Sequence, residues 1–161
     1  SATVLGNYQL AYQVLLILTI MPTIVYQYVL PRQASGLQNK KIKGLAVVVS
    51  IVISFIVLFV APIIIPTIFP KYEKSLDIIQ IMSFAVIPMS ITLMYTSKFL
   101  ALEKSRHVII SAVIFLLVQI FGIIILGDKY GAVGLGVATL LAAISEASYL
   151  SLVNRICYYS K

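Results

Sequence analysis

Long apolar runs alternate with short charged joints along the whole chain. Charge-free stretches cover residues 1–31, 44–65, 78–97 and 108–127, and a fifth stretch, 130–154, has Glu146 as its single charge. An α-helix rises about 1.5 Å per residue, so roughly 20 apolar residues cross a hydrocarbon core of about 30 Å. The pattern therefore predicts five transmembrane helices. They are expected at about residues 4–30, 44–65, 76–97, 107–126 and 131–154.

Composition agrees with this pattern and excludes a soluble globular protein. Hydrophobic residues make up 61% of the 161 residues and charged residues 11%, whereas soluble domains are about half apolar and about one quarter charged. Five buried helices in so short a chain would leave too few residues to cover them. We expect a single all-α membrane domain over residues 1–161.

The charged residues of the joints predict how the chain is oriented. The first joint, the third joint and the C-terminal tail hold nine Lys and Arg residues, and the second and fourth joints hold three. Because cytoplasmic loops carry an excess of Lys and Arg, the first group is assigned to the cytoplasm and the N-terminus to the outside of the cell membrane. The nine residues are Arg32, Lys40, Lys41, Lys43, Lys98, Lys104, Arg106, Arg155 and Lys161.

The predicted topology determines how we interpret the start of the chain and its net charge. Ser1 leads directly into the first predicted helix with no basic segment before it, which disfavours a signal peptide. We expect the C-terminal part of a larger polytopic protein, whose N-terminal helices would be its partners. The net charge of +7 is a topology signal and does not indicate nucleic-acid binding, although the segment 38–43 could contact anionic lipid head groups. Cys157, the single cysteine, is expected to stay reduced.

Polar residues interrupt the first apolar run and form a stripe on the predicted helix. Spacings of four place Gln9 over Gln13 and Tyr8 over Tyr12. These side chains either form hydrogen bonds to neighbouring helices, which is the simpler interpretation, or line a hydrated transport path. Gln119, in the fourth predicted helix, has the same two interpretations.

Glu146 is the one acidic residue deep inside a predicted helix. It precedes Arg155 by nine positions, about 13 Å along the helix axis, which is too far to reach water easily. Gly134, Ala138 and Ala142 precede it at intervals of four and form a ladder of small residues that admits a neighbouring helix. The carboxylate is therefore expected to face protein. It is either a proton- or cation-responsive group of a transport cycle or a structural acid.

Prolines and glycines indicate bends and turns. Pro22, Pro62 and Pro88 each leave a carbonyl of the preceding turn without its amide donor and predict kinks. Of these, Pro22 and Pro88 are also candidate hinges for alternating access, and static kinks are the alternative. The glycines before the last helix do not form a phosphate-binding loop, because an apolar helix and not a strand precedes them. Gly131 is the predicted tight turn, and Gly136 is expected to ease helix entry.

The chain lacks the residue pairs that an enzyme would require. Glu103 and His107 stand four positions apart at the start of the fourth predicted helix, a spacing that could join an acid to an imidazole. A second histidine, a paired carboxylate at membrane depth and a nucleophilic serine motif are all missing from the sequence. We therefore expect an interfacial anchor at this position, no enzymatic activity, and no bound cofactor or metal.

Five short segments carry a resemblance to a known family. They are GNYQLAYQ at 6–13, PR at 31–32, IFPKYEKSLDIIQIMSF at 68–84, ALEKSR at 101–106 and KYGAVGLGVAT at 129–139. In this order and at these separations they resemble the C-terminal half of the polysaccharide flippases. These are the Wzx-like O-antigen and polysaccharide transporters of the multidrug/oligosaccharidyl-lipid/polysaccharide exporter (MOP) superfamily, which is related to the MATE exporters. The resemblance covers nearly the whole chain.

The resemblance implies a fold, a function and a substrate. Family members have twelve or fourteen helices in two bundles around a central cavity, so these five helices would be similar to helices eight to twelve, most of the C-terminal bundle. Such proteins move lipid-linked oligosaccharides from the cytoplasmic to the outer leaflet by alternating access. An N-terminus outside the cell agrees with this numbering if the complete protein starts in the cytoplasm.

One departure from this expectation leaves alternatives open. A phosphate-bearing substrate calls for Lys or Arg in the cavity, and none lies deep in the five predicted helices. The basic partners would then lie in the N-terminal half. A MATE-like cation-coupled exporter, in which Glu146 would matter more, is one alternative. The other is a non-transporting membrane scaffold or an enzyme of surface-glycan biosynthesis.

Overall fold

The structure is a computed structural model, and it describes residues 2–35, 40–68 and 70–159. Almost all of the residues in these ranges are helical, and none of them forms a strand. The all-α class predicted from the apolar runs is therefore confirmed. The described elements are α1 (Ala2–Ala34), α2 (Lys40–Ile68), the short 3-10 helix η1 (Pro70–Ser75), α3 (Leu76–Ala101) and α4 (Ser105–Tyr159).

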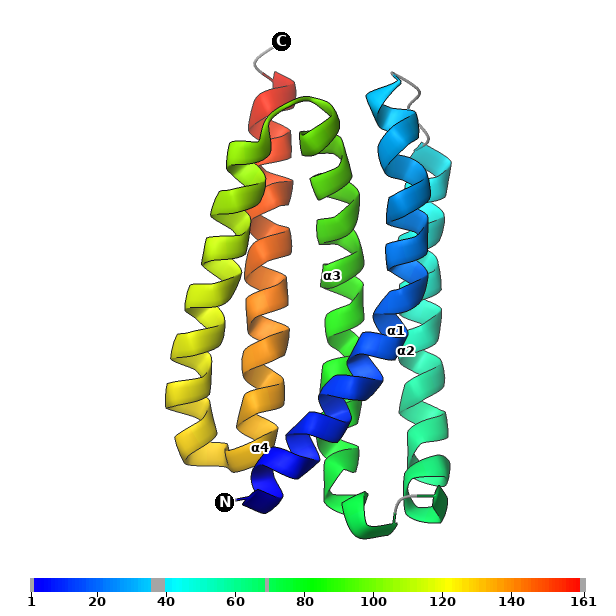
Figure 1. Cartoon of the computed structure of the whole chain (residues 1–161), viewed down its shortest axis with the longest axis vertical. Helices are drawn as coiled ribbons and strands as arrows, with labels where there is room; N and C mark the ends of the chain where they lie inside the picture. The colour runs from blue at the N-terminus through cyan, green and yellow to red at the C-terminus, as the bar shows by residue number, and fades with distance from the viewer. Residues whose placement is uncertain (1, 36–39, 69, 160–161) are drawn as a thin grey trace.

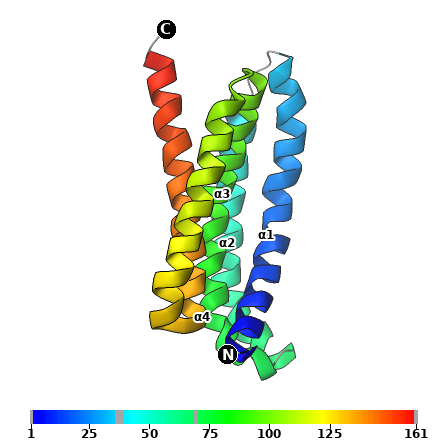
Figure 2. The same cartoon turned by 60° about the vertical axis from the view of Figure 1, so that its left-hand side comes forward.

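The last helix, α4, reverses direction at Gly131. This glycine has φ 58° and ψ −131°, a backbone conformation that residues with a Cβ rarely adopt. Figures 1 and 2 show the two arms of α4 side by side and running in opposite directions. We call residues 105–130 the first arm and residues 132–159 the second arm.

The membrane-spanning helices are found in part as predicted. Within the described residues, four helices are long and apolar enough to cross a membrane, which identifies a membrane protein. The fourth and fifth predicted spans correspond to the two arms of α4, which are separated by non-helical backbone at Gly131. The four candidate spans are Leu5–Ala34, Ile42–Ile68, Leu76–Ala101 and Ser105–Ile156.

The first two helices are longer than hydropathy predicts. The apolar runs predict residues 4–30 and 44–65, whereas α1 and α2 extend past both ends of these ranges. Hydropathy reports where apolar residues end, and a helix can continue into the polar interface because its backbone hydrogen bonds do not depend on side-chain polarity.

Helix α3 occupies the centre of the bundle. It packs against α1, α2 and α4, and Figures 1 and 2 show α1 crossing it obliquely before running beside α2. The buried contact is apolar and includes Leu15 of α1 with Ile78, Met82 and Val86 of α3. A polar link adds to it, since the Ser54 hydroxyl of α2 is 2.7 Å from the Ser83 carbonyl oxygen of α3.

The two ends of the bundle differ in charge. Figure 1 shows the end of α1, the start of α2, the α3–α4 connection and the end of α4 at one end. We call it the basic end, because the described part of the chain brings Arg32, Lys43, Lys98 and Arg155 there. The N-terminal part of α1, η1 and the α4 reversal lie at the opposite end. The joints that are rich in Lys and Arg therefore lie at one end of the bundle, and the joints that alternate with them in the sequence lie at the other end.

Candidate functional site

The outward face of α1 carries amides and tyrosines in the half of the helix remote from the basic end. Gln9, Tyr12 and Gln13 are all exposed, and Tyr12 retains 41% of its surface. Their spacing places them on one helical face. We call these three residues the α1 amide face. They are polar groups inside a candidate membrane span that the described helices do not cover.

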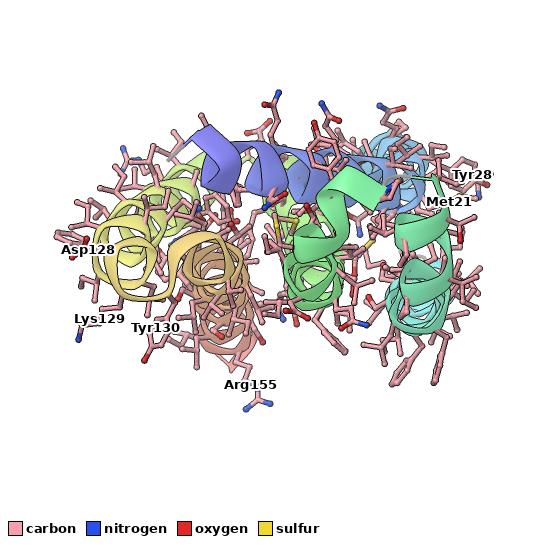
Figure 3. All side chains as sticks on the ribbon, turned by 90° about the horizontal axis from the view of Figure 1, so that it is seen from below. Met21, Tyr28, Asp128, Lys129, Tyr130 and Arg155 are labelled. Atoms are coloured by element: carbon pink, nitrogen blue, oxygen red, sulfur yellow. The ribbon has the colours of Figure 1, made fainter. Side chains whose placement is uncertain are left out.

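The same face changes character toward the basic end. Its middle is apolar, with Ile17, Ile20 and Met21 exposed. Near the basic end Tyr28 projects outward (Figure 3), and the Arg32 guanidinium carbon lies 4.3 Å from the Tyr28 ring centroid. An aromatic ring with a cation over it is typical of the membrane interface. The α1 amide face is therefore the polar part of this surface.

Tyr8 leaves the outward face and joins α1 to both arms of α4. Its hydroxyl lies 3.2 Å from Thr139 Oγ1, and Gln119 Nε2 donates to the same oxygen at 3.1 Å. Because the Thr139 hydroxyl donates to the Leu135 carbonyl at 3.1 Å, Tyr8 is the donor in its contact with Thr139. Its ring stacks on Tyr12 with centroids 6.1 Å apart. Tyr8, Gln119 and Thr139 form what we call the α1–α4 junction.

The α1–α4 junction contains an unsatisfied acceptor. Gln119 Oε1 is buried and has no hydrogen-bond partner among the described residues. A buried carbonyl oxygen without a donor costs about 1–3 kcal/mol. The side-chain amide of Gln119 therefore binds the other arm of α4 through its nitrogen and leaves its oxygen available for a water molecule or a side chain.

The small residues of the second arm lie against the first arm. Gly134 packs on the backbone of Leu126 so closely that a Cβ would overlap its carbonyl. One turn on, a Cβ at Gly122 would be 2.7 Å from that of Ala138. Ala138 and Ala142 are fully buried. Gly136, expected to ease helix entry, instead faces α3, where its Cβ would lie 3.1 Å from Ile78 Cγ2.

Glu146 lies between the two arms of α4, away from the α1 amide face. Its Oε1 accepts a hydrogen bond from the Ser111 hydroxyl at 3.3 Å. A second cross-arm pair lies nearer the basic end, with His107 Nδ1 3.4 Å from the Tyr149 hydroxyl. The structure therefore gives both titratable side chains hydroxyl partners. It does not bring His107 to Glu103, which is exposed in the α3–α4 connection.

Two of the predicted proline bends occupy buried positions. Pro22 is fully buried in α1, and the carbonyl of Leu18 lacks its usual amide donor as a result. Thr23, the next residue, donates its hydroxyl to the Thr19 carbonyl at 2.7 Å, next to the Leu18 carbonyl that Pro22 leaves without its amide donor. Pro88 is buried in α3. Pro62 is exposed on α2.

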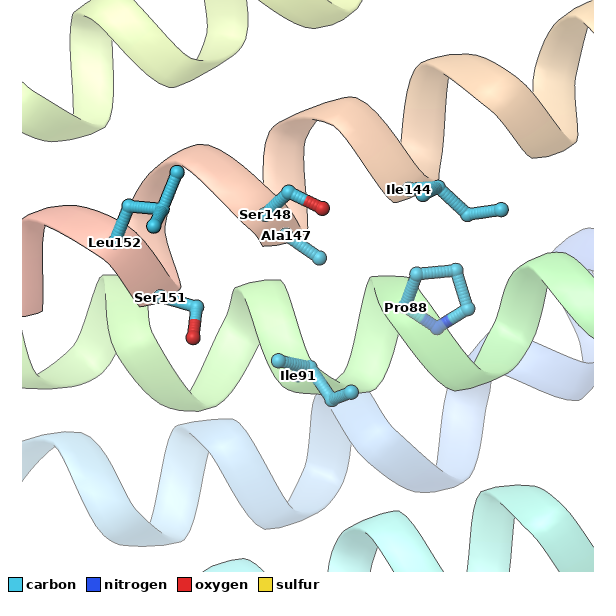
Figure 4. A pocket seen from close by; sticks show the side chains of 7 residues that line it. All are labelled: Pro88, Ile91, Ile144, Ala147, Ser148, Ser151 and Leu152. Carbon is cyan, nitrogen blue, oxygen red and sulfur yellow. The ribbon is translucent and has the colours of Figure 1, made fainter.

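Pro88 also lines a groove between α3 and the second arm of α4 (Figure 4). The groove has a volume of about 460 Å³, and its lining residues lie within two candidate spans, Leu76–Ala101 and Ser105–Ile156. Pro88, Ile91 and Ile144 give it an apolar floor, whereas Ser148 and Ser151 add hydroxyls. We call it the α3–α4 groove.

The basic end is held together by polar contacts between different helices. Lys98 Nζ donates to Asn154 Oδ1 at 2.6 Å, which joins α3 to the second arm of α4. Lys43 Nζ donates to the Met94 carbonyl at 3.3 Å and joins α2 to α3. The Ser97 hydroxyl is 2.9 Å from Gln33 Oε1 of α1.

Three comparisons with known proteins bear on this arrangement. No family model, curated protein or solved structure matches the chain.

In the described ranges, no group of three or more His, Cys, Asp and Glu side chains could hold a metal ion. The side chain of Cys157, residues 38 and 39, and the side chains of Lys40 and Lys41 lie outside the described part of the structure.

Sequence reasoning missed the partners of the predicted site residues. The sequence patterns do not single out Thr139 and Ser111, although these residues bind Gln119 and Glu146. A signal was available in the predicted turn at Gly131. Residues that pair across a helical hairpin are centred close to its turn, and the midpoints of both pairs lie about two residues before Gly131.

Proposed function

We propose that the chain is most of the C-terminal bundle of a polysaccharide flippase, a membrane transporter that moves lipid-linked oligosaccharide precursors across the cytoplasmic membrane by alternating access. In this proposal α4 crosses the membrane twice, once with each arm, so that the chain contributes five spans. The basic end faces the cytoplasm, and the N-terminus of the chain faces outward. The short-segment resemblance to the Wzx-like transporters motivates the choice of family.

The α1 amide face is the observation that carries the proposal. Gln9, Tyr12 and Gln13 are exposed within a candidate span, and polar groups at that depth face protein or water and not lipid. Amides and an aromatic ring also suit a sugar, which offers hydroxyls in both donor and acceptor roles. We infer that this face lines the path or meets the N-terminal helices that complete it.

The direct test is deletion of the complete gene, followed by measurement of the leaflet in which lipid-linked glycan accumulates. The proposal predicts build-up in the inner leaflet and its reversal when the complete gene is restored. A deletion strain in which lipid-linked glycan does not accumulate in the inner leaflet would contradict the flippase proposal.

A variant of the complete protein tests the α1 amide face itself. Gln9→Leu with Gln13→Leu removes two hydrogen-bonding groups worth about 1 kcal/mol each, so we expect transport to fall roughly thirtyfold while membrane insertion is retained. Val52→Leu, on the exposed face of α2, is the matched control and should transport normally. Equal transport by the unsubstituted protein, the double glutamine variant and the Val52→Leu control would show that transport does not require the α1 amide face.

Glu146 supports a second candidate, a MATE-like cation-coupled exporter. Its carboxylate lies between the arms of α4 and shares a hydrogen bond with Ser111. Glu146→Gln keeps the hydrogen bond and removes the titrating proton. In a cation-coupled exporter this variant should lose the dependence of transport on pH or on the driving ion. Unchanged transport with unchanged pH and ion dependence would leave Glu146 a structural role only.

A further inference from the structure

We propose that an anionic phospholipid binds in the α3–α4 groove, with its head group at the basic end and an acyl chain along the apolar floor. The site depends on the membrane placement of the bundle and on the residues that line the groove. The site does not depend on the transported substrate, so the lipid proposal can be tested independently of the flippase proposal.

The groove runs along the membrane normal toward the basic end. Figure 1 shows α3 and the second arm of α4 rising in the same direction, so higher residue numbers on both lie nearer that end. Lys98 follows Pro88 by ten residues, about 15 Å of helix, and Arg155 follows Ile144 by eleven, about 16 Å. The two charges therefore lie beyond the same end of the groove.

The inner part of the groove suits an acyl chain. Pro88, Ile91, Ile144 and Leu152 line it with hydrocarbon, and Ile144 and Leu152 are 44% and 60% exposed. A concave apolar surface at membrane depth is filled by lipid when no helix covers it, since a void would lose the dispersion contacts of its lining.

Two hydroxyls lie where the polar linkage of a lipid would be. The other serine of this arm, Ser145, donates back to the Leu141 carbonyl at 2.8 Å. Ser148 and Ser151, in the described structure, make no such bond and line the groove instead (Figure 4). Their hydroxyls are free to donate to the ester carbonyls that join acyl chains to a head group.

The charge at the end of the groove calls for an anion. Lys98 Nζ contacts the neutral amide oxygen of Asn154, so that contact leaves its charge uncompensated. Arg155 is exposed and lies one turn beyond Ser151 on the same helical face. In the sequence, the first joint, the third joint and the C-terminal tail hold nine basic residues against one acidic residue, Glu103. Basic pockets between transmembrane helices on the cytoplasmic side bind anionic head groups.

These 161 residues contain no tryptophan, so one introduced indole can report on the groove in the complete protein once any tryptophan elsewhere is replaced by phenylalanine. Ile91→Trp places an indole in the lining, and the purified complete protein is reconstituted in phosphatidylcholine bilayers. Phosphatidylglycerol or phosphatidylcholine with brominated acyl chains is then titrated as quencher. We expect brominated phosphatidylglycerol to quench the indole fluorescence at a several-fold lower mole fraction. Phe55→Trp, on the exposed face of α2, should be quenched equally by both lipids.

Two charge variants in the Ile91→Trp background identify the head-group contacts. A basic residue near a membrane surface contributes about 1 kcal/mol to anionic lipid binding, so Lys98→Gln should weaken the phosphatidylglycerol preference about fivefold. The glutamine amide can still donate to Asn154. Arg155→Gln changes an exposed side chain, so it tests the same preference should Lys98→Gln fail to fold by circular dichroism.

Three results would overturn the proposal. Equal quenching of the indole at position 91 by both lipids would remove the head-group contact. Absence of quenching by either lipid would mean that another helix fills the groove. Displacement of brominated phosphatidylglycerol by inorganic phosphate at constant ionic strength would assign the basic residues to a soluble anion. Persistence of the preference in that buffer, together with its loss in Lys98→Gln or Arg155→Gln, supports the lipid.

Discussion

Helices α1 and α2 lie side by side in the bundle, but their outward faces differ in chemistry. The exposed face of α2 is hydrocarbon along its length, with Val48, Val52, Phe55 and Phe59 among its residues. The exposed face of α1 carries Gln9, Tyr12 and Gln13 in one half. Both helices are long and apolar enough to span a membrane. The difference indicates that α2 meets lipid, whereas the α1 amide face meets water or protein.

The largest expected effect comes from placing a charge on each face. Phe55→Arg puts a guanidinium against lipid, which costs about 2.5–3.5 kcal/mol near the centre of a span. Gln13→Arg replaces one polar side chain by another on the α1 amide face and should cost far less. Membrane insertion of the complete protein, followed with a glycosylation reporter, measures both. Similar insertion defects in the two variants would show that the outward faces of α1 and α2 do not differ in their environment.

A smaller loss is expected when the support of α1 is disturbed at α4. Gly134→Ala adds a Cβ that overlaps the Leu126 carbonyl, so the arms must separate and Thr139 must move from Tyr8. Overpacking of this kind typically costs about 1–3 kcal/mol. Unfolding in mixed detergent micelles measures the loss. Gly44→Ala, where a Cβ meets nothing within 4 Å, is the control and should not destabilise the chain.

The smallest effect distinguishes the two stacked tyrosines. Tyr8→Phe removes the hydroxyl that donates to Thr139, and such hydrogen bonds between membrane helices average about 0.6 kcal/mol with a maximum near 1.7. Tyr12→Phe removes an exposed hydroxyl and should leave the free energy of unfolding unchanged. The same micelle titration compares them. An equal loss for both would mean that Tyr12 packs inside the bundle as Tyr8 does.

The sequence predicts helices more completely than it predicts their contacts. Apolar runs define the all-α class, because a backbone in lipid must satisfy its own hydrogen bonds. The predicted turn at Gly131 coincides with the reversal between the two arms of α4. A polar stripe on α1 can be read from spacings of four, but spacing alone does not say that Tyr8 turns inward while Gln9 turns outward. That depends on where α4 lies.

The contacts between the two arms of α4 show why the sequence does not predict the partners of the candidate site residues. The sequence predicts that Glu146 faces protein, but its partner Ser111 depends on the register between the arms, which Gly131 sets. Lys98 is a topology signal in the sequence, and its contact with Asn154 joins residues far apart in the chain. Such pairings arise from the packing of helices against one another, which periodicity within one helix does not encode.

The measurement that tests the central claim most directly is the water accessibility of the two outward faces. In the complete protein with Cys157→Ser, single cysteines replace Gln13 on α1 and Val52 on α2, and intact cells are treated with a membrane-impermeant maleimide. We predict labelling of Gln13→Cys and none of Val52→Cys. Equal protection of both cysteines, together with unimpaired transport by Gln13→Leu, would contradict the difference between the two faces.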